Sequence, residues 1–257
     1  MYFQKLSLLN FKNHKDLSLE FSSQINCIYG KNGVGKTNIL DALHYLALCK
    51  SYFHHNDIQS VFHDENMMMI SGELNKSEYT YRVSCSLQKP GKKSMFWEKA
   101  AYEKFSEHIG KIPLVMITPG DINLLIEGSE ERRKFIDATI SQIDRNYLRD
   151  LQNYAALIVQ RNAQIKKFNE QHRVDRVFIE IMDERIYPLA KKIHEKRAEF
   201  IKELWPLFSK FYSFISGDEE SVEINYVSNF NPEMDAKQFV NSLEKDLQLN
   251  RTQIGIH

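Results

Sequence analysis

The pattern of apolar and polar positions changes near residue 120 of this 257-residue chain. Before that point, short apolar or alternating runs predict strands, which fall over residues 3–8, 17–21, 25–29, 67–74, 79–85 and 114–118. One stretch, residues 38–50, instead repeats apolar side chains at intervals of three and four, as an amphipathic helix does. This part therefore reads as an α/β core with a mixed sheet around one helix.

From residue 129 to about residue 214 the helical spacing is sustained, and polar residues 169–175 interrupt it once. This pattern predicts two long helices that fold back as a hairpin, called the arm below. A β-prone run, residues 222–227, follows the arm. We therefore expect three parts: a core over 1–120, the arm over 121–216, and a return strand with the start of a C-terminal core segment over 217–257.

Residues 30–37 read G-K-N-G-V-G-K-T and match the phosphate-binding loop pattern G-x-x-x-x-G-K-T between a predicted strand and a predicted helix. Glycines let backbone N–H groups surround phosphate oxygens at a helix N-terminus. Lys36 is expected to reach the outer phosphates, Thr37 to bind Mg²⁺, and Asn32 to orient the γ-phosphate or a water. The alternative is an accidental glycine-rich turn. The sequence favours binding of ATP and Mg²⁺, and the predicted contacts are Gly30, Lys31, Asn32, Gly33, Val34, Gly35, Lys36, Thr37 and Asn38.

A protein that hydrolyses ATP also needs a carboxylate for Mg²⁺, usually at the end of an apolar strand. Residues 178–184 resemble such a strand end, but they lie within strong helical periodicity, which favours an ordinary amphipathic helix. Asp121 follows the predicted strand 114–118 after a Pro-Gly turn, where a solvated acid is the simpler interpretation. No catalytic residue is therefore assigned in this chain.

Composition narrows the class of protein. Lys plus Arg and Asp plus Glu both number 34, so the net charge is zero and any nucleic-acid contact must come from a local patch. Cys27, Cys49 and Cys85 have no metal-ligand spacing, and neither a signal peptide nor an apolar run of membrane-spanning length is present. These features predict a cytoplasmic protein with reduced thiols and no membrane partner.

Cationic residues gather on the arm and its approaches. Acidic neighbours dilute most of them, so a solvated helix face is the simpler interpretation for any one residue. Arg132 and Arg133 could contact phosphates or could pin the arm through carboxylates. The remaining cations include Arg161 and Arg197. The preferred candidates for contacts with the DNA backbone are two pairs, Lys166 with Lys167 and Lys191 with Lys192.

Several segments together resemble one family, the RecF recombination-repair proteins, which are ABC-type ATPases related to the heads of SMC and Rad50 proteins. The matching segments are L-N-F-K-N-H at 9–14, the phosphate loop extended to Asp41, P-G-D at 119–121, G-S-E-E-R-R-K-F-I-D at 128–137, and Q-R-N at 160–162 with Lys166. The chain departs from the family pattern at Phe53, where arginine is frequent, and at residues 129–130, where proline is frequent.

The resemblance implies an ABC-type head with a helical-hairpin arm. It implies an ATP-dependent homodimer that clamps single- and double-stranded DNA at gaps or junctions, works with RecO and RecR to load RecA, and serves the SOS response. It also implies a weak DNA-stimulated ATPase for the complete protein, and nucleotide contacts by Lys12 and Asn13. The family continues past residue 257 with its signature and acidic motifs, so we expect this chain to bind ATP at most and neither to hydrolyse it nor to close a dimer.

Two other classes fit parts of the pattern. One is a different ABC head, such as an SMC/Rad50-like, nuclease-associated or transporter ATPase. The other is a non-catalytic interaction module in which the arm is the working part and the phosphate loop is a relic.

Overall fold

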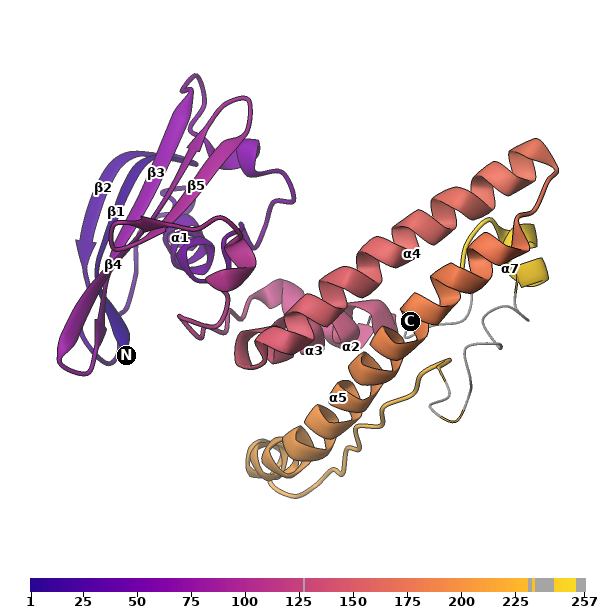
Figure 1. The fold of residues 1–257 in the computed structure, drawn as a ribbon. Coiled ribbons are helices and arrows are strands. Elements are labelled where there is room, and N and C mark those ends of the chain that lie inside the picture. Colours follow the sequence, from indigo (N-terminus) through magenta and orange to yellow (C-terminus); the bar gives the residue numbers. More distant parts are fainter. Residues whose placement is uncertain (127, 231–232, 234–242, 253–257) are drawn as a thin grey trace. The chain divides into compact units, whose positions relative to one another are not determined.

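The computed structural model describes the chain except for residues 127, 231–232, 234–242 and 253–257 (Figure 1). The chain forms two compact units, Met1–Asp121 and Ile122–His257. Within the described part, no helix is long and apolar enough to cross a bilayer.

The first unit is built on a six-stranded sheet in the order β2-β1-β3-β4-β5-β6. Its strands are β1 (Tyr2–Phe11), β2 (His14–Glu20), β3 (Met67–Lys76), β4 (Tyr79–Gln88), β5 (Lys92–Trp97) and β6 (Ala100–Ala101). Every strand pair in this sheet is antiparallel. The expected α/β head is therefore present, but its sheet is antiparallel where a mixed sheet was predicted. Short connections make antiparallel pairs of β1 with β2 and of β3, β4, β5 and β6 in succession, and β3, which follows α1, also runs antiparallel to β1.

Helix α1 (Lys36–Leu48) packs on one face of this sheet (Figure 1). Its buried residues Tyr45 and Leu46 meet the inward-facing side chains of the strands, such as Leu6 and Ile70. Burying each large apolar side chain contributes ~1.5–3 kcal/mol. Gly72 on β3 lets the helix approach, since a Cβ atom there would lie 2.8 Å from Leu46 Cδ1.

Two predicted strands of this unit are wrong. Residues 25–29 and 114–118 lack regular secondary structure, and their apolar side chains are largely exposed, as for Ile25, which is 90% exposed, and Ile117, which is 82% exposed. A β-prone run becomes a strand only where a neighbouring strand supplies hydrogen-bond partners. Within the described residues these two runs have no such neighbour, whereas β5 and β6, which were not predicted, pair with β4 and β5.

Short 3₁₀ turns, Asp57–Ser60, Phe105–Glu107 and Pro119–Ile122, join parts of the first unit and lead out of it. The last of these contains Asp121, whose carboxylate accepts hydrogen bonds from the Tyr52 hydroxyl and the Thr118 N–H, both at 2.5 Å. These two donors give Asp121 a local structural role.

The second unit contains the arm. Its helices are α2 (Asn123–Ile126), α3 (Ser129–Ile143), α4 (Arg145–Gln171), α5 (Arg176–Ser216) and α7 (Leu243–Leu249). Helices α4 and α5 form the predicted hairpin, and their turn falls inside the polar stretch 169–175 (Figure 1). Asp144 and Asp175 cap the N-termini of α4 and α5 by accepting from backbone N–H groups. The cap at Asp144 also divides α3 from α4, a break that the sequence periodicity did not predict.

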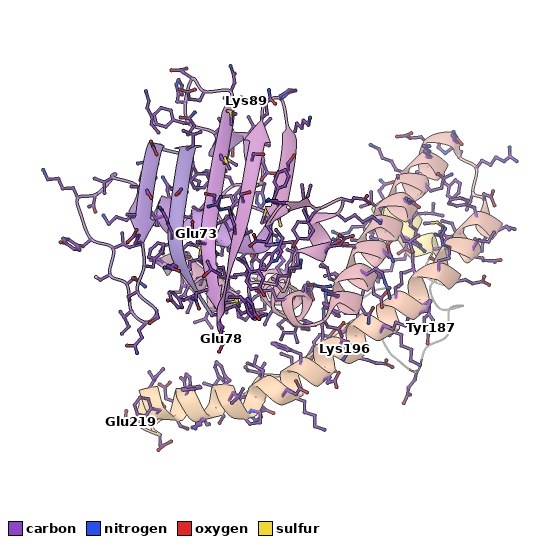
Figure 2. All side chains as sticks on the ribbon, turned by 60° about the vertical axis from the view of Figure 1, so that its left-hand side comes forward. Glu73, Glu78, Lys89, Tyr187, Lys196 and Glu219 are labelled. Carbon is purple, nitrogen blue, oxygen red and sulfur yellow. The ribbon has the colours of Figure 1, made fainter. Side chains whose placement is uncertain are left out.

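Helix α5 is a single element of 41 residues that contains Pro188 and Pro206. Figure 2 marks its middle with Tyr187 and Lys196. Residues 178–184 lie in this helix, so the amphipathic helix that their periodicity favoured is confirmed and the alternative, the end of an apolar strand, is excluded. Towards its C-terminus the helix exposes Phe211 and Phe214.

The predicted return strand at residues 222–227 is also wrong, because this segment runs beside α5 without regular structure (Figure 1). Side chains hold it there. The Tyr226 ring lies 5.1 Å from the His194 ring, and the Phe230 ring lies 5.8 Å from the Tyr187 ring. Aromatic contacts with a helix have replaced the backbone ladder of a strand. The remainder of the expected C-terminal core segment falls largely on residues outside the described part.

Candidate nucleotide-binding site

The phosphate loop joins residues 25–29 to α1 and turns through three glycines with positive φ, which are Gly30, Gly33 and Gly35. Gly33 and Gly35, at φ +83° and +97°, adopt conformations that residues with a Cβ atom avoid. Gly35 is the N-cap of α1 and has no side chain to occupy the N–H groups of the first helical turn. These N–H groups, together with the helix dipole, make this end of α1 suitable for an anion.

Lys36 and Thr37 occupy the positions that nucleotide binding requires. The Lys36 ammonium lies over its own loop and donates to the carbonyl oxygens of Gly30 and Lys31, both at 2.8 Å. It can exchange these partners for phosphate oxygens because the loop is open to solvent. Thr37 is exposed in the first turn of α1, where its hydroxyl oxygen suits Mg²⁺. Among the residues that the structure describes, no group of three or more His, Cys, Asp or Glu side chains could hold a metal ion.

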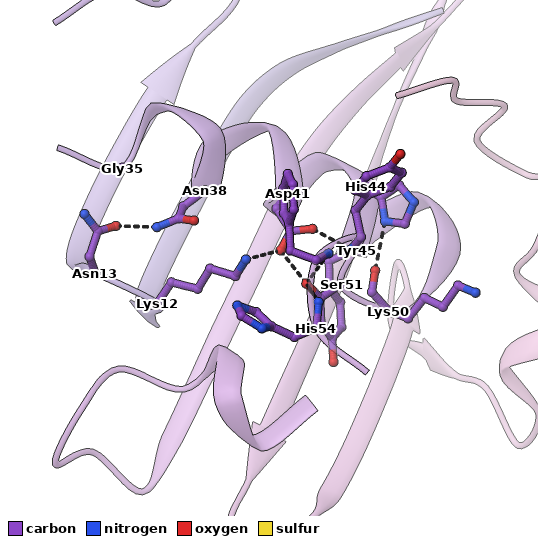
Figure 3. A network of polar contacts seen from close by, with 12 residues as sticks. Lys12, Asn13, Gly35, Asn38, Asp41, His44, Tyr45, Lys50, Ser51 and His54 are labelled. Carbon is purple, nitrogen blue, oxygen red and sulfur yellow. Dashed lines mark hydrogen bonds and ion pairs between the residues drawn. The ribbon is translucent and has the colours of Figure 1, made fainter. Parts of the chain in front are cut away.

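The turn between β1 and β2 contacts the phosphate loop (Figure 3). The Asn13 side-chain amide donates to the Gly33 carbonyl at 3.2 Å, and the Asn38 amide donates to Asn13 Oδ1 at 2.8 Å. His14 Nε2 lies 3.1 Å from the Gly35 carbonyl, which can only accept, so this nitrogen carries the proton. The turn and α1 thereby hold the loop from one side.

Lys12 is turned away from the loop and into a buried polar cluster. Its ammonium lies 2.6 Å from Asp41 Oδ2, and the two side chains are 7% and 0% exposed. Asp41 also accepts from the Ser51 hydroxyl at 2.7 Å and from the Tyr52 N–H at 2.6 Å (Figure 3). Sequence reasoning missed Asp41 as the centre of this cluster. The available signal was a carboxylate on the apolar face of a helix that also carries Ile39 and Ala42.

An open hollow of about 740 Å³ lies beside the loop and is lined by Asn13, which contacts Gly33 of the loop, and by Asn38, which follows the loop and contacts Asn13. This volume is in the range of small-molecule sites. The rest of the lining is mostly polar and includes Lys12, His54, Gln59, Val61, His63, Asp64, Glu65, Asn66 and Lys89. The first unit therefore has a phosphate-binding loop with a polar recess beside it.

At the other end of α1, two buried histidines are held neutral. Burial lowers the pKa of His44 and of His108 from the ordinary value. His44 Nδ1 lies 3.0 Å from the Lys50 carbonyl, and His108 Nε2 lies 2.7 Å from the Leu46 carbonyl. These contacts satisfy carbonyls at or just beyond the end of α1 and so fix the helix that carries the phosphate loop.

In the arm, the Q-R-N segment lies in a buried network. Arg161 is fully buried and donates to Asp183 and Asp246, each at 2.7 Å, while Thr252 donates to Asn162. Burial raises the pKa of Asp183, and its pairing with Arg161 opposes that rise. The network ties α4, α5 and α7 together, so Arg161 is removed from any surface contact.

The segment R-R-K-F-I-D also takes part in a polar network that joins helices of the arm, through Asp137. Arg197 on α5 makes two hydrogen bonds of 2.8 Å to Asp137, and the Tyr147 hydroxyl donates to the same carboxylate at 2.5 Å. Arg133 donates to the Ser129 hydroxyl, and Arg132 donates to the Leu124 carbonyl. The role of these two arginines towards DNA stays a prediction.

The structure does not bring the two predicted lysine pairs together. Lys166 and Lys167 are exposed near the hairpin turn, whereas Lys191 and Lys192 lie further along α5. Lys192 lines a second hollow with acidic neighbours such as Asp144 and Asp150. The first pair lies near a turn with further basic residues, which are His172, Arg173 and Arg176, whereas the hollow beside Lys192 contains both basic residues, Arg149 and Lys196, and acidic ones.

Comparison with known proteins places this geometry in a family. Residues 5–253 match the family described as an AAA domain. The DNA replication and repair protein RecF of Flavobacterium johnsoniae is 44% identical over 257 residues, which are 100% of this chain and 72% of that protein. RecF of Cytophaga hutchinsonii is 38% identical over 258 residues, which cover all of this chain and 68% of that protein.

Solved structures agree. One described as the recombination mediator protein RecF-ATPrS in the RecFOR pathway matches with a TM-score of 0.92 and 30% identity, over 100% of this chain and 71% of that one. The corresponding RecF-ATP structure matches with a TM-score of 0.91 and the same coverage. Since the likeness in sequence and in fold spans the whole chain, this chain belongs to the RecF family of DNA replication and repair proteins.

Proposed function

We propose that the first unit binds ATP with Mg²⁺ as part of a RecF-type DNA replication and repair protein. The observation that carries the proposal is the loop at residues 30–37, with open backbone N–H groups, Lys36 and Thr37 gathered at the start of α1. The match to a RecF-ATP structure over the whole chain supports it.

In this proposal the phosphates lie at the loop and contact Lys36, while Thr37 supplies a hydroxyl oxygen to Mg²⁺. The base and ribose lie in the adjoining hollow, since its wall includes Asn13 and Asn38 and so continues directly from the loop. Hydrolysis is not expected from this chain alone. The carboxylates considered from the sequence have other positions, Asp121 in a turn and Asp183 and Glu184 on α5, where Asp183 is paired with Arg161.

We propose DNA as the second ligand, bound by the phosphate backbone at the hairpin turn around Lys166 and Lys167. Lys191 and Lys192 are the weaker candidates because acidic residues surround Lys192. Single- and double-stranded DNA, the proteins RecO, RecR and RecA, a role in the SOS response, a cytoplasmic location and an ATP-dependent homodimer of the complete protein all follow from family membership and belong to this proposal.

The nucleotide proposal is tested by titrating a fluorescent ATP analogue with Mg²⁺ into the chain and into Lys36→Ala, while light scattering follows the oligomeric state. Saturable binding by the chain that weakens strongly in the variant supports the proposal. Binding of equal strength in both proteins would show that the loop is not the site.

A second candidate function, a protein-interaction module, is favoured by one observation. The C-terminal part of α5 exposes Leu207, Phe211, Phe214 and Ile215, which are between 58% and 86% exposed. Exposed apolar patches commonly mark contact surfaces. If this surface were the working part and the loop a relic, partner binding would be the same in the chain and in Lys36→Ala, with or without nucleotide.

A further inference from the structure

We propose that the turn at residues 12–14 is a brace for the phosphate loop. Lys12 is its anchor, Asn13 and His14 are its two contacts with the loop, and all three act as positioning residues. This inference rests on the nucleotide-binding role proposed above, and it changes the role that the family resemblance implied for Lys12 and Asn13.

The anchor is fixed by its surroundings. The Lys12 ammonium pairs with the fully buried Asp41 at 2.6 Å and lies 5.1 Å from the centre of the Phe53 ring. Both partners favour the cation, the first by charge and the second through its aromatic face. Lys12 therefore holds the turn to α1 and to the segment after it.

The two contacts of the brace act on carbonyl groups of the loop. Asn13 binds the Gly33 carbonyl and His14 binds the Gly35 carbonyl. In a planar trans peptide the C=O and the following N–H point in opposite directions. Holding the Gly33 carbonyl towards the turn therefore directs the N–H group of Val34 away from it. The Gly35 carbonyl is held by His14 together with the backbone N–H groups of Asn38 and Ile39, and the N–H group of Lys36 points the opposite way. Those N–H groups are the donors that a phosphate would use.

The fit between the turn and the loop is close. A Cβ atom on Gly35 would lie 2.4 Å from both Asn13 Oδ1 and His14 Nε2, so only glycine allows this contact. Asn38 completes the brace, because its amide donates to Asn13 Oδ1 and leaves Asn13 Nδ2 directed at Gly33. Glycine is therefore required at position 35 for two reasons: its positive φ, and the space beside it that Asn13 and His14 occupy.

The test compares four variants of the whole chain: Asn13→Ala, His14→Ala, His14→Gln and, as a matched control on the exposed side of β2, Ser18→Ala. Two quantities are measured, the exchange rates of the backbone amides of residues 31–37 without nucleotide, and the Kd for a fluorescent ATP analogue with Mg²⁺. We expect both alanine variants to speed exchange in the loop and to weaken binding by about three- to tenfold. His14→Gln should restore both, since its side-chain amide can donate to the same carbonyl, and Ser18→Ala should change neither.

The outcomes separate the brace from the nucleotide proposal. Faster loop exchange in the alanine variants, with no nucleotide bound even by the unchanged chain, would support the brace and reject the nucleotide proposal. Unchanged exchange in both alanine variants would overturn the brace. If binding weakened in that second case, Asn13 and His14 would be direct ligands of the nucleotide.

Discussion

The phosphate loop and the buried network of the arm both coincide with segments that resemble the same family, yet they use charge in opposite ways. Lys36 is accessible and bonded only to backbone carbonyls among the contacts described, so it is available to a ligand. Arg161 is fully buried between Asp183 and Asp246 and is saturated by the protein itself. Segments that resemble the same family can thus include residues that are open to a ligand in one place and residues that stabilise the fold in another.

The largest effect should come from the arm. Arg161→Met removes the only cation described between two buried carboxylates, and breaking a buried pair from one side costs ~3–5 kcal/mol. We expect a lower midpoint of urea unfolding, or failure to fold. Arg149→Met, on the exposed surface of the same helix, is the control and should change the midpoint little. Equal midpoints for the two variants would contradict a structural role for Arg161.

Next in size is the loss of binding in Lys36→Ala. Removing a charge-assisted contact with the phosphates should weaken the fluorescent ATP analogue about 100-fold, which corresponds to ~2.7 kcal/mol. The unfolding midpoint should stay nearly constant, because the Lys36 ammonium is exposed. If Lys36→Ala lowered the stability strongly but left the affinity unchanged, Lys36 would be a structural residue like Arg161.

A smaller effect is expected for DNA. Lys166→Gln and Lys167→Gln should each reduce the slope of log K against log salt by roughly one, whatever the DNA sequence, if each lysine neutralises a phosphate. The measurement is a salt titration of duplex binding by fluorescence anisotropy. Lys191→Gln with Lys192→Gln provides the internal comparison and should change the slope less. If the slope stayed the same in Lys166→Gln and Lys167→Gln, the proposal that the hairpin turn contacts DNA would be rejected.

The smallest effect concerns His108. Burial lowers its pKa in the folded state, so below the unfolded value of 6.5 the unfolded chain binds the proton more readily. Stability is therefore complete above about pH 6.5 and falls as the pH decreases towards the folded pKa. His108→Gln can still donate to the Leu46 carbonyl and should flatten this decline in unfolding temperature between pH 7 and pH 5. A decline as steep as that of the unchanged chain would assign it to other groups, His44 among them.

Local pattern was sufficient for the features that depend on neighbours in sequence. The phosphate loop, α1, the hairpin of α4 and α5, and the pair β3 and β4 were all predicted, because periodicity and turn residues specify them. Residues 25–29 have the composition of a strand, but no neighbouring strand pairs with them in the described part of the chain. Composition alone does not show whether such a neighbour exists. Strand β5 begins with two lysines that follow a turn, and so its alternation of apolar and polar residues covers too few positions to be recognised.

The polar clusters could not be predicted from local pattern, since they join residues distant in sequence. Lys12 meets Asp41, and Arg161 meets Asp246, through the tertiary fold alone. From sequence, Arg161 and Arg197 were cations on an amphipathic arm. The Q-R-N segment marked Arg161 as part of a family resemblance, but it did not separate a buried arginine from an exposed neighbour such as Lys166. Burial was the missing quantity, and it changes a candidate DNA contact into a structural residue.

The length of α5 has a mechanical consequence. At 1.5 Å per residue its 41 residues extend for about 60 Å, so one stiff rod reaches from the hairpin turn to the exposed apolar end. A force applied at either end is carried along the rod. Bending should concentrate at Pro188 and Pro206, because their ring nitrogens cannot donate to the preceding turn of the helix. Helix α5 should therefore bend at two defined positions and not evenly along its length.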